Sequence, residues 1–250
     1  MPRRPAMQRR PVRRVEARPD AKPDGDAWWA RIPAVAHLLR EGLDLPDGVT
    51  FLVGENGSGK STVVEAVAMA YGLNPEGGSV YARHRTRPTE SALCDALRLV
   101  RSPYRAHAYF LRAETSHGLY TYLESAAGTR GAGEDAKLHE RSHGEGFLDL
   151  LRRKFDGYGF YLMDEPEAPL SFTSTLSLLS TLDSLRAAGA QVVVATHSPV
   201  LTALPGAHIL ELGGHGIRRV AWSELELVGH WRRYLTEPAS YLDRLLAGSD

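Results

Sequence analysis

The segment from Gly54 to Thr62 holds the residues best suited to chemistry. It fits the pattern G-x-x-x-x-G-K-[ST] and consists of Gly54, Glu55, Asn56, Gly57, Ser58, Gly59, Lys60, Ser61 and Thr62. Glycines let backbone N–H groups turn inward around phosphate oxygens, and a helix that starts here adds partial positive charge. Lys60 suits the β- and γ-phosphates, and the Ser61 hydroxyl suits Mg²⁺. The segment predicts a binding loop for a nucleoside triphosphate such as ATP.

The residues on either side of this loop predict the elements that must position it. The stretch 49–53 is β-branched and apolar, which indicates a buried strand. The stretch 61–71 places Val64, Val67, Ala68 and Tyr71 at helical spacing. Strand, glycine loop and helix follow one another in the order that phosphate binding requires.

Two carboxylates end a second predicted strand. Phe160 to Met163 is apolar and is followed directly by Asp164 and Glu165. Asp164 is a candidate ligand for Mg²⁺, because hard cations prefer oxygen ligands. Glu165 is a candidate general base that accepts a proton from an attacking water. We therefore expect both acids beside the phosphate loop.

A third predicted strand, 191–196, ends in His197. Ligands of open α/β sheets bind at the carboxyl ends of the strands, so His197 is a candidate contact to the γ-phosphate. The loop from Ser142 to Gly146 precedes an apolar helical pattern over 147–155. A glycine-containing loop at a helix start is suited to anions, although many helices begin in this way.

The remaining elements follow from periodicity and turn residues. We expect a helix over 91–100, a strand over 106–113, a weaker strand over 118–124 and a helix over 172–188. Two strands, 208–212 and 217–222, form a predicted hairpin. Ser223 is the expected cap of a final helical stretch that runs towards Leu246 and breaks near Pro238.

Composition limits the class of protein. The chain has 250 residues and a formal net charge of zero, which fits one α/β domain or two small ones. A single cysteine, Cys94, allows no internal disulfide and favours a reducing compartment. No apolar run is long enough to span a membrane and no signal region begins the chain. We expect a cytoplasmic protein without structural zinc, because no His/Cys spacing typical of zinc sites occurs.

Residues 1–27 differ from the rest of the chain. They hold seven Arg and one Lys against four acidic residues, together with five prolines, and few apolar residues. This composition predicts a disordered basic tail, with residues 28–250 as one domain. Trp28 and Trp29 follow, and one of these rings is a candidate for stacking on adenine, the alternative being that either belongs to the core at an edge strand.

Together the motifs resemble those of the ATP-binding-cassette (ABC) ATPases over residues 28–222. The residues that carry the resemblance are "VGENGSGKST", "SHGEGFL", "LMDEPE" and "ATHSP", in that order. Within the superfamily the chain is similar to compact stand-alone bacterial ATPases of the AAA-family label, through "YFLRAE", "MDEPEAPLS" and "YLTEPASYLDRLL". The resemblance implies a three-layer α/β/α P-loop fold with a mixed sheet, an antiparallel β portion and a small helical portion at about residues 85–155.

The resemblance also implies a mechanism. Two copies of such ATPases pack head to tail over two ATP molecules, each site taking its phosphate loop from one copy. Ser142 and Gly144 of one copy would then contact the γ-phosphate held by Lys60 of the other. Glu165 would polarise the water and His197 would steady the γ-phosphate.

The chain departs from the family pattern in two places that bear on these roles. The usual Leu-Ser-Gly-Gly-Gln signature is replaced by Arg-Ser-His-Gly-Glu over 141–145. The glutamine that follows the next strand in transporter subunits is absent, and Glu114 occupies its expected position as a candidate contact to Mg²⁺ or its waters.

Three functions are compatible with the motifs. We favour a soluble Mg²⁺-dependent ATPase that forms an ATP-dependent homodimer and acts on a macromolecular partner that the sequence does not identify. The first alternative is the ATP-binding subunit of a membrane importer, for example for siderophores, peripheral to the membrane. The second is a DNA-repair-type ATPase without coiled-coil arms, using the tail or Arg83, Arg85 and Arg87 on phosphates.

Overall fold

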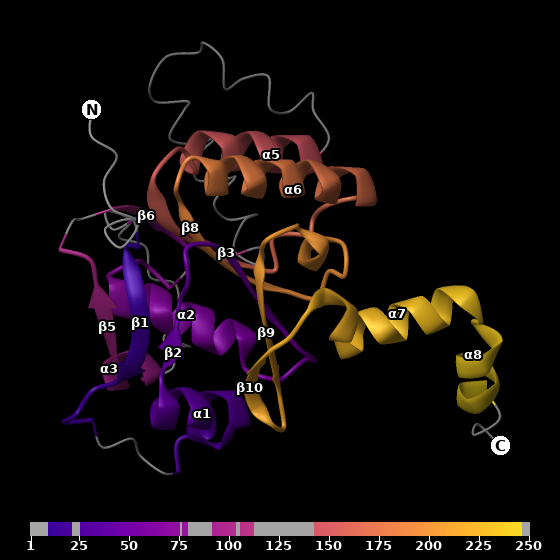
Figure 1. Ribbon diagram of the computed structural model, residues 1–250, viewed down its shortest axis with the longest axis horizontal. Helices are drawn as coiled ribbons and strands as arrows, with labels where there is room; N and C mark the ends of the chain where they lie inside the picture. Colours follow the sequence, from indigo (N-terminus) through magenta and orange to yellow (C-terminus); the bar gives the residue numbers. More distant parts are fainter. Residues whose placement is uncertain are drawn as a thin grey trace.

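The computed structural model shows a mixed α/β protein whose central sheet lies between two layers of helices (Figure 1). It describes residues 10–21, 26–75, 77–79, 92–103, 106–112 and 143–246. The predicted α/β class with a mixed sheet is confirmed. The weaker strand expected over 118–124, and most of the expected helical portion at 85–155, lie outside the described residues.

Within these residues, seven strands form the main sheet in the order β10-β9-β3-β8-β7-β6-β4. Their bounds are β3 Gly48–Val53, β4 Gly78–Ser79, β6 His107–Arg112, β7 Gly159–Asp164, β8 Gln191–Thr196, β9 His208–Gly213 and β10 Gly216–Arg219. The five inner strands are parallel, whereas β4 and β10 run antiparallel to their neighbours at the two edges. The hairpin predicted for the last two strands is therefore confirmed.

The register of the central strands decides where their last residues meet. Val53 of β3 pairs with Thr196 of β8, and Asp164 of β7 pairs with Ala195 of β8. Because these strands are parallel, their carboxyl ends lie at the same edge of the sheet. The residues that follow each strand are thereby brought together.

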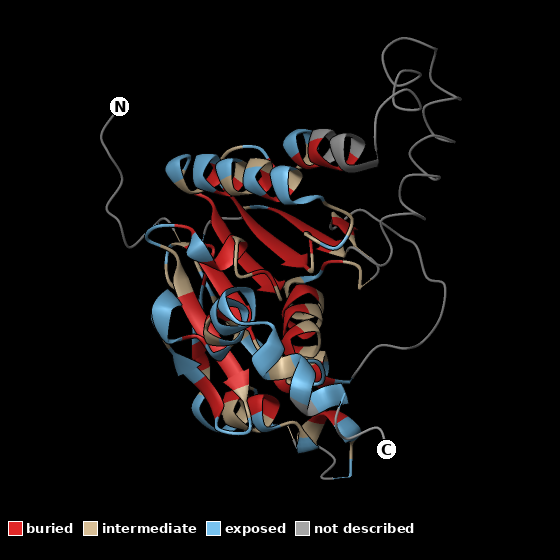
Figure 2. Ribbon diagram, turned by 90° about the vertical axis from the view of Figure 1, so that its right-hand side faces the viewer, coloured by how far each residue is buried: buried red, intermediate tan, exposed pale blue. Residues whose placement is uncertain are grey.

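Alternate residues of the buried strands point to opposite faces of the sheet, as strand geometry requires. Leu52, Leu162 and Val193 pack in one core with α2 (Lys60–Tyr71) and α1 (Pro33–Glu41). Phe51, Tyr161 and Val192 pack in the other core with α5 (His143–Lys154) and α6 (Phe172–Ala187). In Figure 2 the central strands of the main sheet are red, because they are buried between helices whose outer faces are exposed.

A smaller antiparallel sheet lies beside the first core and includes a strand from residues that were expected to be disordered. Its order is β2-β1-β5, with β1 Val12–Ala17, β2 Leu43–Asp44 and β5 Leu97–Arg101. The prediction of a disordered tail over residues 1–27 is therefore wrong for Val12–Ala17. Val12 and Val15 are fully buried, and β1 hydrogen-bonds to strands on both sides, which outweighs the polar composition of the segment.

The helix predicted over 91–100 is also wrong. The chain instead forms a short helix, α3 (Leu93–Ala96), and then enters β5. The sequence Leu-Arg-Leu-Val-Arg satisfies both a helical and a strand pattern, and pairing with β1 decides between them.

The chain ends in two helices that extend away from the sheets (Figure 1). These are α7 (Glu226–Thr236) and α8 (Ala239–Leu246), separated near Pro238 as expected. Ser223 does not cap α7, because it lies within a 3-10 turn, η5 (Trp222–Glu224), and Leu225 precedes the helix. Every residue from His230 to Ser240 is exposed. Among the described helices, none has both the length and the apolar character that a bilayer span needs.

Two further 3-10 turns complete the elements of the described residues. They are η2 (Trp28–Arg31) and η4 (Leu201–Ala203). Trp29 of η2 is buried in the core, whereas Trp28 is exposed. Trp29 is thus a core residue, on a 3-10 turn rather than an edge strand, and Trp28 stays the candidate for stacking on adenine.

Candidate functional site

The loop 54–59 joins β3 to α2, as predicted, and two of its glycines are required by close contacts. A Cβ atom on Gly54 would lie 2.3 Å from the carbonyl oxygen of Leu212. Gly59 precedes α2 with φ of +98°, and a Cβ there would lie 2.8 Å from Cγ2 of Ile32. Left-handed backbone favours glycine, so any other residue at this position would strain the loop.

We expect Gly59→Ala to lower the free energy of unfolding by about 2 kcal/mol, because it adds a steric overlap to an unfavourable φ. The matched variant is Gly57→Ala, where φ is +80° but no atom lies within 4 Å of the added Cβ. This variant has the unfavourable φ without the steric overlap, so we expect it to lower the free energy of unfolding by about 1 kcal/mol. Urea unfolding curves measure both, and equal losses would contradict a role for the contact with Ile32.

Lys60 is the first residue of α2, directly after the loop, and is buried. Its ammonium donates hydrogen bonds to the carbonyl oxygens of Gly54, at 2.8 Å, and Glu55, at 3.1 Å. Burial lowers the pKa of Lys60, while the nearby charges of Glu165 and Asp164 act in the opposite direction. The side chain is therefore held where the loop encloses it and where acidic groups favour its charge.

Ser61 and Asp164 meet although they are distant in the sequence. The Ser61 hydroxyl donates a hydrogen bond of 2.9 Å to Oδ1 of Asp164, which is buried. Arg112, at the end of β6, lies 3.8 Å from Oδ2 of Asp164 and pairs with Glu65 of α2 at 2.7 Å. A hydroxyl and a carboxylate side by side form the kind of oxygen pair that suits Mg²⁺.

Glu165 and His197 also lie together, at the ends of β7 and β8. Oε1 of Glu165 lies 3.0 Å from Nε2 of His197. Glu165 is the one non-glycine residue with positive φ in the described chain, at +50°. Its backbone N–H donates to the carbonyl oxygen of Ala195, 2.9 Å away. Such backbone is costly for a non-glycine residue and is often found where a side chain must be aimed.

Sequence reasoning missed Glu167 and Arg112. One carboxylate oxygen of Glu167 accepts hydrogen bonds from the Thr196 hydroxyl and from the His197 N–H, the latter at 2.8 Å. Burial raises the pKa of Glu167, although these hydrogen bonds act to lower it. The available signal was the second glutamate in "DEPE" and the arginine that ends the strand before Glu114.

The structure brings together some of the predicted site residues and leaves others undescribed. Lys60 and Ser61 lie beside the ends of β7 and β8, with Asp164, Glu165 and His197. Gly144 lies in the first turn of α5, whereas Ser142 and Glu114 lie outside the described residues. Within the described chain, no three His, Cys, Asp or Glu side chains gather as potential metal ligands.

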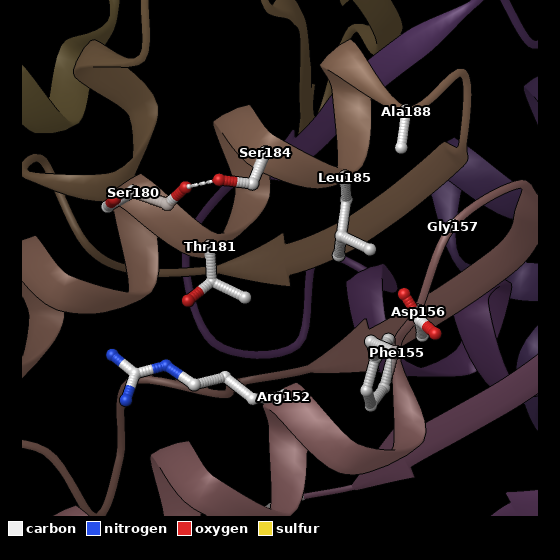
Figure 3. Close-up of a pocket in the computed structure, with 9 residues that line it drawn as sticks. All are labelled: Arg152, Phe155, Asp156, Gly157, Ser180, Thr181, Ser184, Leu185 and Ala188. Carbon is white, nitrogen blue, oxygen red and sulfur yellow. Dashed lines mark hydrogen bonds between the residues drawn. The ribbon is translucent and has the colours of Figure 1, made fainter.

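A separate groove of about 370 Å³ runs between the end of α5 and the side of α6 (Figure 3). Its lining includes Arg152, Phe155 and Leu185. Two of its hydroxyls are used inside α6, since Ser184 donates to the carbonyl oxygen of Ser180 and Thr181 donates to that of Ser177. None of the predicted site residues lines this groove.

Comparisons with known proteins give a partial family match and distant structural likenesses. Residues 37–87 match the family model described as an AAA domain. No curated protein matches the chain in sequence. Among solved structures, a metal-chelate type ABC transporter in an inward-facing conformation is 17% identical, with a TM-score of 0.44 over 74% of this chain and 76% of that chain.

Two further solved structures have similar sequence identities and TM-scores. A dimeric bacterial ABC transporter cassette is 16% identical, with a TM-score of 0.42 over 72% of this chain and 88% of that chain. The SMC head domain from Thermotoga maritima is 14% identical, with a TM-score of 0.41 over 72% and 92%. The residues matched by the AAA domain model include the phosphate loop, which joins β3 to α2 in the described structure.

Proposed function

We propose that the protein binds Mg²⁺–ATP and hydrolyses it to ADP and phosphate. The observation that carries this proposal is the contact between Ser61 and Asp164 beside the buried ammonium of Lys60. A buried lysine in a glycine loop is costly unless an anion compensates it, and the loop amides and the start of α2 favour phosphate. The hydroxyl–carboxylate pair adds oxygen ligands of the type that Mg²⁺ takes alongside phosphates.

The donor set fits both groups. Mg²⁺ is usually held by one or two protein oxygens together with phosphate oxygens and water, so Ser61 and Asp164 are sufficient. When bound, Mg²⁺ neutralises charge on the transferred phosphoryl group. Lys60 would exchange its hydrogen bonds with Gly54 and Glu55 for bonds to the phosphates. The role of Glu114 near the metal stays a prediction.

Glu165 is the proposed general base and His197 the proposed contact to the γ-phosphate. The 3.0 Å between them supports a joint role, because one water could contact both groups. Glu165 would take the proton from the water, and its aim is fixed by the backbone hydrogen bond to Ala195. Catalysis of this kind depends on positioning and charge rather than on covalent chemistry.

The proposed active form is a head-to-tail homodimer. Its support is the family resemblance, in which Ser142 and Gly144 of one copy face the phosphates bound by the other. The position of Gly144 in the first turn of α5 fits such a role, since helix N-termini bind anions. A purified sample that shows ATP hydrolysis only with Mg²⁺, and dimers by light scattering only with bound ATP, would support the complete proposal.

Lys60→Ala tests the binding step. We expect its affinity for ATP to fall at least tenfold, since a full charge in a partly desolvated site is removed. Isothermal titration with Mg²⁺–ATP measures the loss. Lys154→Ala, at the end of α5, is the matched control and should bind as the wild type does. Equal affinities for the two variants would count against the proposed nucleotide site.

A further inference from the structure

The carboxylate of Glu167 anchors the chain at the end of β8, directly at the His197 N–H and indirectly through the Thr196 hydroxyl. A single oxygen, Oε1, accepts hydrogen bonds from the Thr196 hydroxyl and the His197 N–H. The Thr196 oxygen in turn accepts a hydrogen bond of 2.9 Å from the N–H of Ser198. The path of the chain through His197 therefore depends on one acidic side chain from the neighbouring strand's loop.

A tight turn places Glu167 in this position. The N–H of Ala168 donates to the carbonyl oxygen of Glu165 at 3.0 Å, which folds the chain back after β7. The positive φ of Glu165 starts this turn. Glu165 and Glu167 thus belong to the same turn but contact different parts of His197. Glu165 contacts the ring, and Glu167 accepts a hydrogen bond from the backbone N–H.

The chain beyond His197 is anchored by other groups. The Thr202 hydroxyl donates to the carbonyl oxygens of Ser198 and Pro199, both at 3.1 Å. The indole N–H of Trp222 donates to the Pro199 oxygen at 3.0 Å. The hydrogen bonds from Thr202 and Trp222 reach residues that follow His197. Within the described residues, Glu167 is the acceptor for the N–H of His197 itself.

We propose that Glu167 is a positioning residue that acts through the His197 backbone to keep the imidazole against Glu165. Its effect on turnover rests on the proposed function, but its effect on the backbone does not. The second carboxylate oxygen, Oε2, is buried and accepts no hydrogen bond within the described residues, so the role requires one acceptor and not a bidentate group.

This role predicts that glutamine can replace Glu167 and alanine cannot. In Glu167→Gln the amide oxygen still accepts from Thr196 and His197, so we expect kcat within threefold of wild type. In Glu167→Ala the His197 N–H loses its partner, so we expect kcat for ATP to fall at least tenfold while KM changes less than twofold. Hydrogen exchange of a peptide covering 191–200, followed by mass spectrometry, should become at least tenfold faster in Glu167→Ala and stay near wild type in Glu167→Gln.

Glu224→Ala is the matched control. Its carboxylate also accepts a backbone N–H, that of Ala221 at 2.8 Å, but lies on the exposed η5 turn. It should leave kcat unchanged, and it should not speed the exchange of 191–200 tenfold as Glu167→Ala does. A Glu167→Gln protein as slow as Glu167→Ala would overturn the proposal, because it would assign the role to charge or proton transfer.

The outcomes separate this inference from the proposed function. A wild-type protein without ATP turnover would remove the proposed function, and the exchange rates of the three variants would still decide whether Glu167 holds the His197 backbone. Normal turnover and normal exchange in Glu167→Ala would overturn the inference alone.

Discussion

Replacement of Glu165 by glutamine is expected to lower the rate of ATP hydrolysis at least a hundredfold and to leave ATP binding within a factor of three. Glutamine keeps the shape of the side chain and can still hold a water, but it cannot take the proton. General bases contribute about 10²- to 10⁴-fold to rate, which sets the expected loss. Phosphate release in a single turnover measures the chemistry, and equilibrium titration with Mg²⁺–ATP measures the binding.

The control for Glu165→Gln is Asp183→Asn, which removes an exposed carboxylate on α6 that pairs with Arg186. Its turnover should equal that of the wild type. If the dimer closes on ATP, Glu165→Gln should also accumulate as a dimer in gel filtration with light scattering, because the bound triphosphate is not consumed. A Glu165→Gln protein that hydrolyses ATP at the wild-type rate would rule out this residue as the base.

Replacement of Gln191 by leucine is expected to lower the free energy of unfolding by about 3–5 kcal/mol. The Gln191 side chain is buried where β8 begins, and it joins the main sheet to the smaller one. Its amide oxygen accepts from the N–H of Val12 at 3.0 Å, and its nitrogen donates to the carbonyl oxygens of Val12, Leu45 and Pro46. Each buried polar group left without a partner costs about 1–3 kcal/mol, so leucine should affect several groups together.

Thermal unfolding followed by circular dichroism measures the effect of Gln191→Leu. For a chain of this size 1 kcal/mol corresponds to about 2–4 °C, so we expect Tm to fall by roughly 10 °C. Ser177→Ala is the control, because this partly exposed hydroxyl donates to the carbonyl oxygen of Thr173 within α6. A loss below about 1 kcal/mol would show that water replaces the amide at this junction.

The sequence predicted the parts of the fold in which local pattern and tertiary structure agree. The strands at 49–53 and 191–196 are continuous apolar runs, and both are central strands. The strand β1 was missed because its partners are far along the chain: Val12 pairs with Arg101, and the amide of Gln191 bonds to Val12. Neither contact leaves a periodic signal within residues 10–17.

The residues of the candidate site also fall into those that local sequence pattern predicts and those that depend on distant contacts. Lys60 follows a glycine, Asp164 ends a strand, and Glu165 and His197 directly follow strands. Their types and places could therefore be predicted from the sequence. Glu167 could not, because its role depends on a side chain that reaches a backbone N–H 30 positions away. Such a contact depends on the turn that Glu165 begins, and the positive φ of a glutamate is not visible in composition or spacing.

The exposed helices α7 and α8 should open at a lower free-energy cost than the two sheets. The last residue of α7 that is buried against the body is Val228, and the following helical turns contact mainly α8, through the rings of His230, Tyr234 and Tyr241. Segments with few buried contacts open at low free-energy cost, whereas buried central strands open only when the whole domain unfolds. Cleavage by trypsin at Arg232 or Arg233 should therefore precede any cleavage of the sheets, and the trimmed body should keep both of its cores.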